Sequence, residues 1–113
     1  LTEVEPGMAA FDEEIFGPVF TVIVAKDNDE AINLANKTEF GLGSAIFTKN
    51  IKKGKEIAKT KMQSGVCFVN DFVKSDPRLP FGGIKMSGYG RELSNYGMME
   101  FVNIKTIVVK STD

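Results

Sequence analysis

The 113 residues are enough for one domain with a single hydrophobic core, and the composition (42% hydrophobic, 26% charged) is ordinary for a soluble globular protein. The formal net charge of −1 and the absence of an apolar run near ~20 residues argue against nucleic-acid and membrane partners. With no histidine and one cysteine, the chain cannot form a Cys-His nucleophile pair or an internal disulfide and lacks the commonest metal ligand. No metal site is therefore expected, and the chain is expected to be cytoplasmic.

The first 70 residues alternate predicted strands and helices. Asp27 and Asn50 are expected to cap the two helices, because their side chains can accept hydrogen bonds from free backbone N–H groups. The regular spacing of these elements predicts an α/β fold built from parallel βαβ units. In chain order they are a strand at residues 19–25 that reads as buried on both faces, a helix from residue 28 to about 37, a strand at 44–48, a helix over 51–62 and a strand at 66–70.

The regular alternation stops after residue 70. Residues 71–90 contain two prolines and four glycines and predict a long irregular segment, which in a compact domain is usually functional. A short helix is expected around residues 95–101. The final strand, residues 104–110, has no later element to pair with, so its partner must be sought elsewhere.

Cys67 is the obvious nucleophile to consider, and the sequence argues against that role. It lies between Val66 and Phe68 in a predicted strand, with no nearby basic residue to lower the pKa of its thiol. A small buried packing residue is the favoured interpretation. Cys67 is therefore not expected to act as a nucleophile.

The glycine-rich segment from Pro80 to Leu93 invites a phosphate-loop interpretation, which fails in its details. Gly83 and Gly88 have the outer spacing of a P-loop, but Tyr89 occupies the position of the required lysine. Two interpretations remain. The segment is either a tightly folded packing loop or the wall of a pocket, with Phe81 as an apolar lining residue.

The stretch Glu13-Glu14-Ile15-Phe16-Gly17-Pro18 places two carboxylates before an apolar pair and a rigid Gly-Pro corner. Exposed turn acids are the general expectation for such carboxylates. The corner also allows a second interpretation: a carboxylate held beside a phenylalanine can accept two hydrogen bonds from the vicinal diol of a ribose. The local pattern leaves both open.

Taken together, five motifs resemble the C-terminal portion of the aldehyde dehydrogenase superfamily. The resemblance covers essentially the whole chain, and within the superfamily it is nearest to the succinate-semialdehyde dehydrogenase group. The motifs are EEIFGPV, TEFGLGSAIFTKN, GVCFVND, LPFGGIKMSGYGREL and the closing KTIVV, which begin at residues 13, 38, 65, 79 and 105.

The resemblance implies the oxidation of an aldehyde to a carboxylic acid with NAD or NADP. By position, Glu14 matches the acid that holds the nicotinamide ribose hydroxyls, and Phe16 matches the phenylalanine beside it. Phe81 matches an aromatic residue of the aldehyde tunnel, and Ser75 falls where semialdehyde enzymes place a hydroxyl near the distal end of the substrate. The nucleophilic cysteine, the general-base glutamate and the dinucleotide-binding domain of the family would all lie upstream.

The resemblance further implies a fragment, with residues 1–102 as the C-terminal part of the catalytic domain and 103–113 as an oligomerisation strand and tail. Residues 104–110 would extend the sheet of a neighbouring subunit in a homo-oligomer, a dimer or a tetramer. We expect the chain alone to be inactive. The alternative is a stand-alone assembly module that pairs through its terminal strand. Of the two arginines, Arg91 is expected to make a structural pairing, and Arg78 is a possible partner for a substrate carboxylate.

Overall fold

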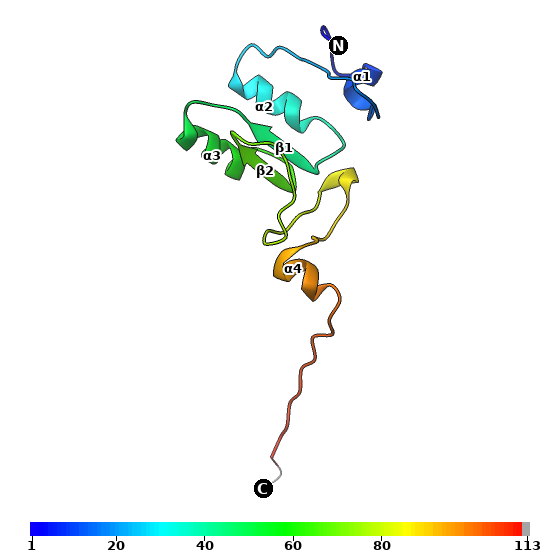
Figure 1. Ribbon diagram of the computed structural model, residues 1–113, viewed down its shortest axis with the longest axis vertical. Coiled ribbons are helices and arrows are strands. Elements are labelled where there is room, and N and C mark those ends of the chain that lie inside the picture. Colours follow the sequence, from blue (N-terminus) through cyan, green and yellow to red (C-terminus); the bar gives the residue numbers. More distant parts are fainter. Residues whose placement is uncertain (112–113) are drawn as a thin grey trace.

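The computed structural model describes residues 1–111, and residues 112 and 113, the end of the predicted tail 103–113, lie outside the described residues. Within 1–111 the chain forms a small α/β unit from which the C-terminal segment extends as an isolated arm (Figure 1). The elements are α1 (Ala9–Asp12), α2 (Asn28–Asn36), β1 (Gly43–Ile46), α3 (Ile51–Thr60), β2 (Val66–Val69), the 3-10 turn η1 (Lys85–Ser87) and α4 (Ser94–Met99).

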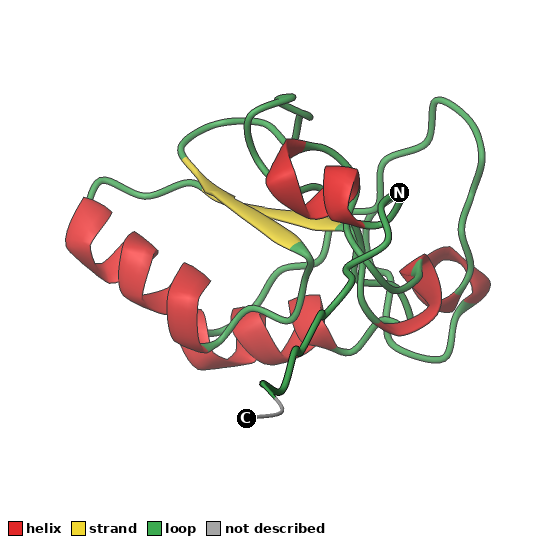
Figure 2. Ribbon diagram, turned by 90° about the horizontal axis from the view of Figure 1, so that it is seen from below, coloured by secondary structure: helices red, strands yellow, loops and turns green. Residues whose placement is uncertain are grey.

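The sheet consists of β1 and β2, which pair in parallel with Gly43 opposite Val66 and Ile46 opposite Val69. Helix α3 makes the crossover between them and packs beside β2 (Figures 1 and 2). The helix approaches closely because Gly54 faces the strand: a Cβ atom there would lie 2.9 Å from Val69 Cγ1. The predicted parallel βαβ unit is confirmed.

Both predicted helix caps are present. The Asp27 side chain accepts a hydrogen bond from the backbone N–H of Glu30 at 2.8 Å, and the Asn50 side chain accepts one from Lys53 at 3.0 Å. Each bond satisfies one of the N–H groups that a helix leaves without an internal partner. These local interactions explain why the starts of α2 and α3 could be located from the sequence.

The glycine-rich segment folds back onto the end of α2. The Lys85 ammonium donates to the carbonyls of Asn36 (2.7 Å) and Thr38 (3.1 Å), so it caps the C-terminal end of the helix. Gly41 accepts a hydrogen bond from Ile84 N–H and donates its own N–H to Ser87 Oγ. The segment is therefore anchored to the sheet-bearing part of the chain, as the packing-loop interpretation requires.

The strand expected at residues 19–25 is not formed in this chain. The segment is extended, and its hydrogen bonds include the 2.8 Å bond from Val22 N–H to the Leu1 carbonyl and the bond from the Leu1 amino group to the Phe20 carbonyl. The Thr21 hydroxyl also donates to the Ala10 carbonyl at 3.0 Å. Phe20 is 81% and Val24 90% exposed, so the prediction of burial on both faces was wrong here. A strand needs a ladder of backbone hydrogen bonds to a neighbouring strand. The two bonds to Leu1 do not extend into such a ladder, and among residues 1–111 no strand pairs with this segment.

The arm formed by residues 104–110 is extended and has no strand partner within the described residues, as expected from its position in the sequence. Its apolar side chains are open to solvent; the exposed fractions of Ile104, Ile107, Val108 and Val109 are 73–86%. Figure 1 shows the arm leading directly away from the rest of the chain. It therefore presents an unpaired apolar strand.

The chain does not close a hydrophobic core of its own. Its accessible surface is 9392 Å², whereas a compact monomer of 12.4 kDa exposes about 6100 Å². The radius of gyration is 19.4 Å, against roughly 13 Å for a compact domain of this length. Among residues 1–111, Val4 is the single buried large hydrophobic side chain. Most of the apolar surface therefore remains uncovered. None of the helices described is long and apolar enough to cross a membrane.

Candidate functional site

Two depressions lie on either side of the β1 start and the glycine-rich segment. The smaller has a volume of about 540 Å³, and the larger, open depression has about 1370 Å³. Leu42 and Ser87 line both of them, which makes the two depressions neighbours. This adjacency matters because Glu14 lines the smaller depression and Phe81 lines the larger one.

Glu14 reaches the smaller depression from the turn that follows α1, together with Glu13. The Glu14 carboxylate is exposed and makes no hydrogen bond or ion pair with another described residue, so all of its acceptor positions are open. Phe16 is 95% exposed and lines neither depression. The structure thus places the two residues on one turn and brings only Glu14 to a concave surface.

Phe81 is held in place by the backbone. Its N–H donates to the Glu92 carbonyl at 2.9 Å and its carbonyl accepts from the Glu92 N–H at 2.8 Å, which forms an isolated antiparallel bridge. Arg91 closes the same turn, because its Nη1 donates to the carbonyls of Gly83 (3.0 Å) and Gly90 (2.6 Å). The expected structural role of Arg91 is therefore seen directly.

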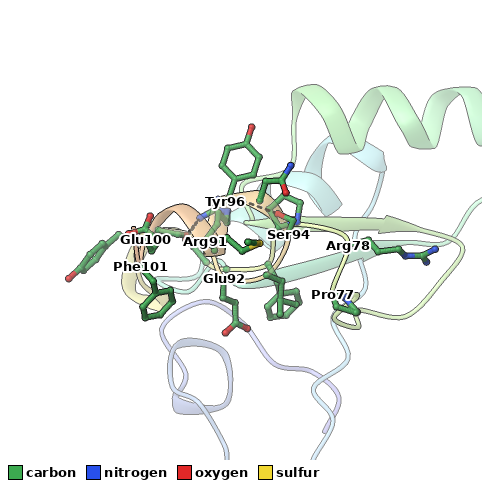
Figure 3. Close-up of a pocket in the computed structure, with 18 of the residues that line it drawn as sticks. Pro77, Arg78, Arg91, Glu92, Ser94, Tyr96, Glu100 and Phe101 are labelled. Carbon is green, nitrogen blue, oxygen red and sulfur yellow. Dashed lines mark hydrogen bonds between the residues drawn. The ribbon is translucent and has the colours of Figure 1, made fainter. Parts of the chain in front are cut away.

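The larger depression is shown in Figure 3, with Arg91 and Glu92 near its centre and α4 along one side. Its lining combines apolar and aromatic side chains with four charged residues, Arg78, Arg91, Glu92 and Glu100. This is the lining that small-molecule sites use. Besides Leu42, Phe81 and Arg91, it includes Pro77, Arg78, Pro80, Tyr89, Tyr96, Met98 and Phe101.

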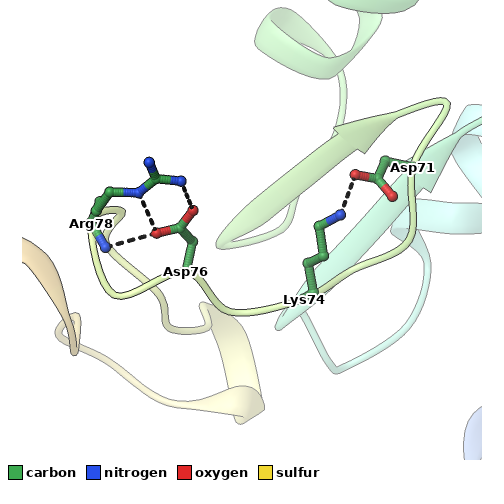
Figure 4. Close-up of polar contacts among 4 residues, drawn as sticks. All are labelled: Asp71, Lys74, Asp76 and Arg78. Carbon is green, nitrogen blue, oxygen red and sulfur yellow. Dashed lines mark hydrogen bonds and ion pairs between the residues drawn. The ribbon is translucent and has the colours of Figure 1, made fainter.

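The loop between β2 and Phe81 carries two ion pairs (Figure 4). The Lys74 ammonium lies 2.6 Å from Asp71 Oδ2. Arg78 forms a two-pronged pair with Asp76, with Nε–Oδ1 at 2.9 Å and Nη2–Oδ2 at 2.6 Å, and its backbone N–H also donates to Oδ1. Sequence reasoning missed the role of Asp76, although its spacing of two from Arg78 across Pro77 could have signalled a local pair.

Hydrogen bonds from Arg78 hold the pKa of Asp76 well below its usual range, and those from Lys74 and the Phe72 N–H lower the pKa of Asp71. Both carboxylates therefore remain charged at ordinary pH. Because the folded-state pKa values are lowered, any stabilisation by the pairs is present above the usual aspartate pKa and is lost as the pH falls through the lowered values. The exposure of these pairs keeps that stabilisation small.

Ser75 lies between the two ion pairs, and it is exposed and lines neither depression. The start of its loop is fixed by Phe72, whose ring packs on Phe47 with the centroids 5.7 Å apart. The structure therefore places Ser75 and Phe81 on one loop without bringing both to the same concave surface. Within residues 1–111, no three potential metal-ligating side chains gather into a cluster, and Cys67 lies half-buried in β2.

Comparison with known proteins accounts for this architecture. Residues 1–107 match the aldehyde dehydrogenase family. The chain belongs to this family. It is 47% identical over 107 residues to the succinate semialdehyde dehydrogenase [NAD(P)+] Sad of Escherichia coli, a match that covers 95% of this chain and 23% of that protein. It is 45% identical over 107 residues to the NADP(+) succinate-semialdehyde dehydrogenase of Deinococcus radiodurans, covering 95% and 22% respectively.

Solved structures of aldehyde dehydrogenases have the same fold over this region. Succinic semialdehyde dehydrogenase from Streptococcus pyogenes, in complex with NADP+, superposes with a TM-score of 0.91 at 41% identity, covering 97% of this chain and 24% of that one. The α/β fold expected from the resemblance is thus confirmed. The chain spans about a quarter of the length of the relatives that it matches.

Proposed function

We propose that this chain is the C-terminal part of an NAD(P)-dependent aldehyde dehydrogenase that oxidises succinate semialdehyde to the dicarboxylic acid. The observation that carries the proposal is the 45–47% identity to enzymes named for this substrate, over nearly the whole chain and about a quarter of their length. The uncovered apolar surface supports it, because a part of a larger enzyme packs such surface against the remainder.

Within that enzyme Glu14 serves as the acceptor for the ribose hydroxyls beside the nicotinamide. The chemistry of Glu14 fits this role: its carboxylate has no partner among the described residues, Glu14 lines a depression, and a carboxylate can accept both hydrogen bonds of a vicinal diol. The exposed ring of Phe16, two residues along the same turn, supplies an apolar surface for the adjoining part of the cofactor. When bound, NAD(P)+ supplies the hydride acceptor. These residues position it and take no part in bond breaking.

Phe81 and the 71–81 loop shape the passage for the aldehyde. The Phe81 backbone is fixed by its bridge to Glu92, so the ring is held on the wall of the larger depression. Ser75 lies on the same loop and is assigned to the distal end of the substrate. The nucleophile belongs to a part of the enzyme outside this chain, since Cys67 is a strand residue of the βαβ unit.

Replacing Glu14 by glutamine tests the cofactor role. In the longer enzyme that carries this chain, Glu14→Gln is expected to raise the dissociation constant of NAD(P)+ and to slow hydride transfer, each by roughly 10- to 100-fold, because charge-assisted hydrogen bonds are lost. Cofactor titration and single-turnover formation of NADH or NADPH from succinate semialdehyde measure the two effects. Glu13→Gln is the matched control and should change neither. Equal effects of the two variants would contradict the assignment.

The isolated 113-residue chain is expected not to bind the cofactor usefully. Glu14 and Phe16 cover only one part of a dinucleotide, and the longer enzyme supplies the rest. Saturating NAD+ or NADP+ should therefore leave the melting temperature of the isolated chain unchanged while raising that of the longer enzyme. A clear rise for the isolated chain would show that it carries a cofactor site of its own.

A second candidate function rests on the exposed arm. An extended segment with open backbone groups and apolar side chains can add a strand to the sheet of another molecule. On this interpretation the chain acts alone as an assembly module. The native mass of the isolated chain separates the candidates: a discrete oligomer favours the module, and ill-defined aggregates favour the enzyme part.

A further inference from the structure

We propose that Arg78 binds the carboxylate of the semialdehyde substrate through the outer edge of its guanidinium, and that Asp76 is the positioning residue that orients it. The inference rests on the proposed function, because it assumes an aldehyde with a terminal carboxylate. It adds a specificity residue for that substrate and a reason for the Asp-Pro-Arg sequence of the loop.

The guanidinium of Arg78 uses only one of its two donor edges in hydrogen bonds to Asp76. Asp76 takes the Nε–H and one Nη2–H, which together form one edge of the group. Among the described residues nothing accepts from Nη1, so the edge formed by Nη1 and the second Nη2–H is open. That edge has the same parallel pair of N–H donors as the occupied one, and it matches a second carboxylate. Figure 4 shows Asp76 on one side of the guanidinium and the remaining nitrogen directed away from it.

The other basic side chains of residues 71–93 already have hydrogen-bond or ion-pair partners. Lys85 donates to two carbonyls at the end of α2, and Arg91 Nη1 donates to two carbonyls of the glycine-rich turn. Lys74 is paired with Asp71 and does not line the larger depression. Arg78 alone combines an oriented guanidinium, an open donor edge and a position on the rim of that depression.

The position of Arg78 in the fold suits a substrate contact. Its loop follows the carboxyl end of β2, the edge of a parallel sheet at which α/β proteins bind ligands. Phe81, three residues on, lines the same depression, and the Arg78 side chain extends outward from the rim (Figure 3). An arginine at the rim suits the distal end of a short substrate, whose aldehyde group enters first.

Asp76 orients the guanidinium of Arg78 and partly neutralises its positive charge. Fixing the guanidinium removes rotamer freedom before the substrate arrives, which lowers the entropy lost on binding. The carboxylate of Asp76 also offsets the positive charge, so attraction depends on geometry more than on net charge. The pair therefore favours a planar carboxylate over other anions.

The test uses the longer enzyme and two aldehydes of equal chain length, succinate semialdehyde and uncharged butanal. Arg78→Ala is expected to raise the KM for succinate semialdehyde by roughly 10- to 100-fold and to leave the KM for butanal unchanged. Lys61→Ala, which removes a paired cation outside residues 71–81, is the matched control and should alter neither. Because the Arg78 side chain is 85% exposed, the variant is expected to fold.

The Asp76 variants separate positioning from structure. Asp76→Ala should raise the KM for succinate semialdehyde several-fold with little change in kcat or in the KM for butanal, and Asp76→Glu should recover part of the loss. Asp29→Ala, which removes the partner of Lys61, is the corresponding control. Equal changes in the KM of both aldehydes for Arg78→Ala, or none, would overturn the inference while leaving the proposed function intact. Failure of the unaltered enzyme to oxidise succinate semialdehyde would overturn both.

Discussion

Gly65→Ala is expected to lower the free energy of unfolding of the enzyme by about 3 kcal/mol or more, the largest effect of any single substitution suggested by this structure. Gly65 immediately precedes β2, and its N–H donates to the Gly41 carbonyl at 2.9 Å. A Cβ atom there would overlap the carbonyl oxygen of Gly82 and lie 3.0 Å from Gly83 Cα. Both obstacles are backbone, so no side-chain rotation relieves them.

The consequence extends beyond stability, because Gly82 directly follows Phe81. Displacing the Gly82 carbonyl would disturb the bridge between Phe81 and Glu92, and with it the wall of the larger depression. We therefore expect a lower urea midpoint together with weaker substrate binding. Gly17→Ala is the control for stability, since nothing lies within 4 Å of a Cβ atom at that position. A Gly65→Ala enzyme with an unchanged urea midpoint would show that Gly65 and Gly82 are not in contact.

The expected role of residues 104–110 in joining subunits predicts that breaking this arm dissociates the oligomer. Its four large apolar side chains, at residues 104, 107, 108 and 109, are 73–86% exposed, and burying each against a neighbour would contribute about 1.5–3 kcal/mol. Val108→Pro removes a backbone N–H in the middle of the arm and prevents a continuous strand ladder. The native mass, measured by light scattering, should fall from that of the oligomer to that of the monomer.

Val108→Thr is the matched control for this prediction, because threonine keeps the β-branched shape and the backbone N–H. It should retain the oligomeric mass at protein concentrations at which Val108→Pro is dissociated. An unchanged mass for Val108→Pro would contradict the pairing of residues 104–110 with a neighbouring subunit.

Local signals in the sequence were enough to predict the βαβ unit. Asp27 and Asn50 cap helices through bonds that span only three residues, so the helix starts follow from neighbouring side chains. The strands β1 and β2 find each other within the chain, and their parallel pairing followed from the intervening helix. The structural role of Arg91 could likewise be anticipated from its place in the glycine-rich motif.

Residues 19–25 show where such reasoning fails. Their β-branched run predicted a strand buried on both faces, yet among residues 1–111 the segment has no strand neighbour and most of its side chains are exposed. On the proposed function, the hydrophobic pattern reflects an environment that the rest of the enzyme would supply. A pattern of this kind indicates that a segment becomes buried, but it does not identify the part of the protein that covers it.

The sequence by itself determined the α/β class, the helix caps and the βαβ order, since these depend on interactions between residues close along the chain. The tertiary structure alone decided that Glu14 and Phe81 line neighbouring depressions, that Phe16 and Ser75 line neither, and that Asp76 occupies one edge of Arg78. Which atoms remain open to a ligand depends on how the loop after β2 and the glycine-rich turn fold back in space. Residue order along the chain does not specify that geometry.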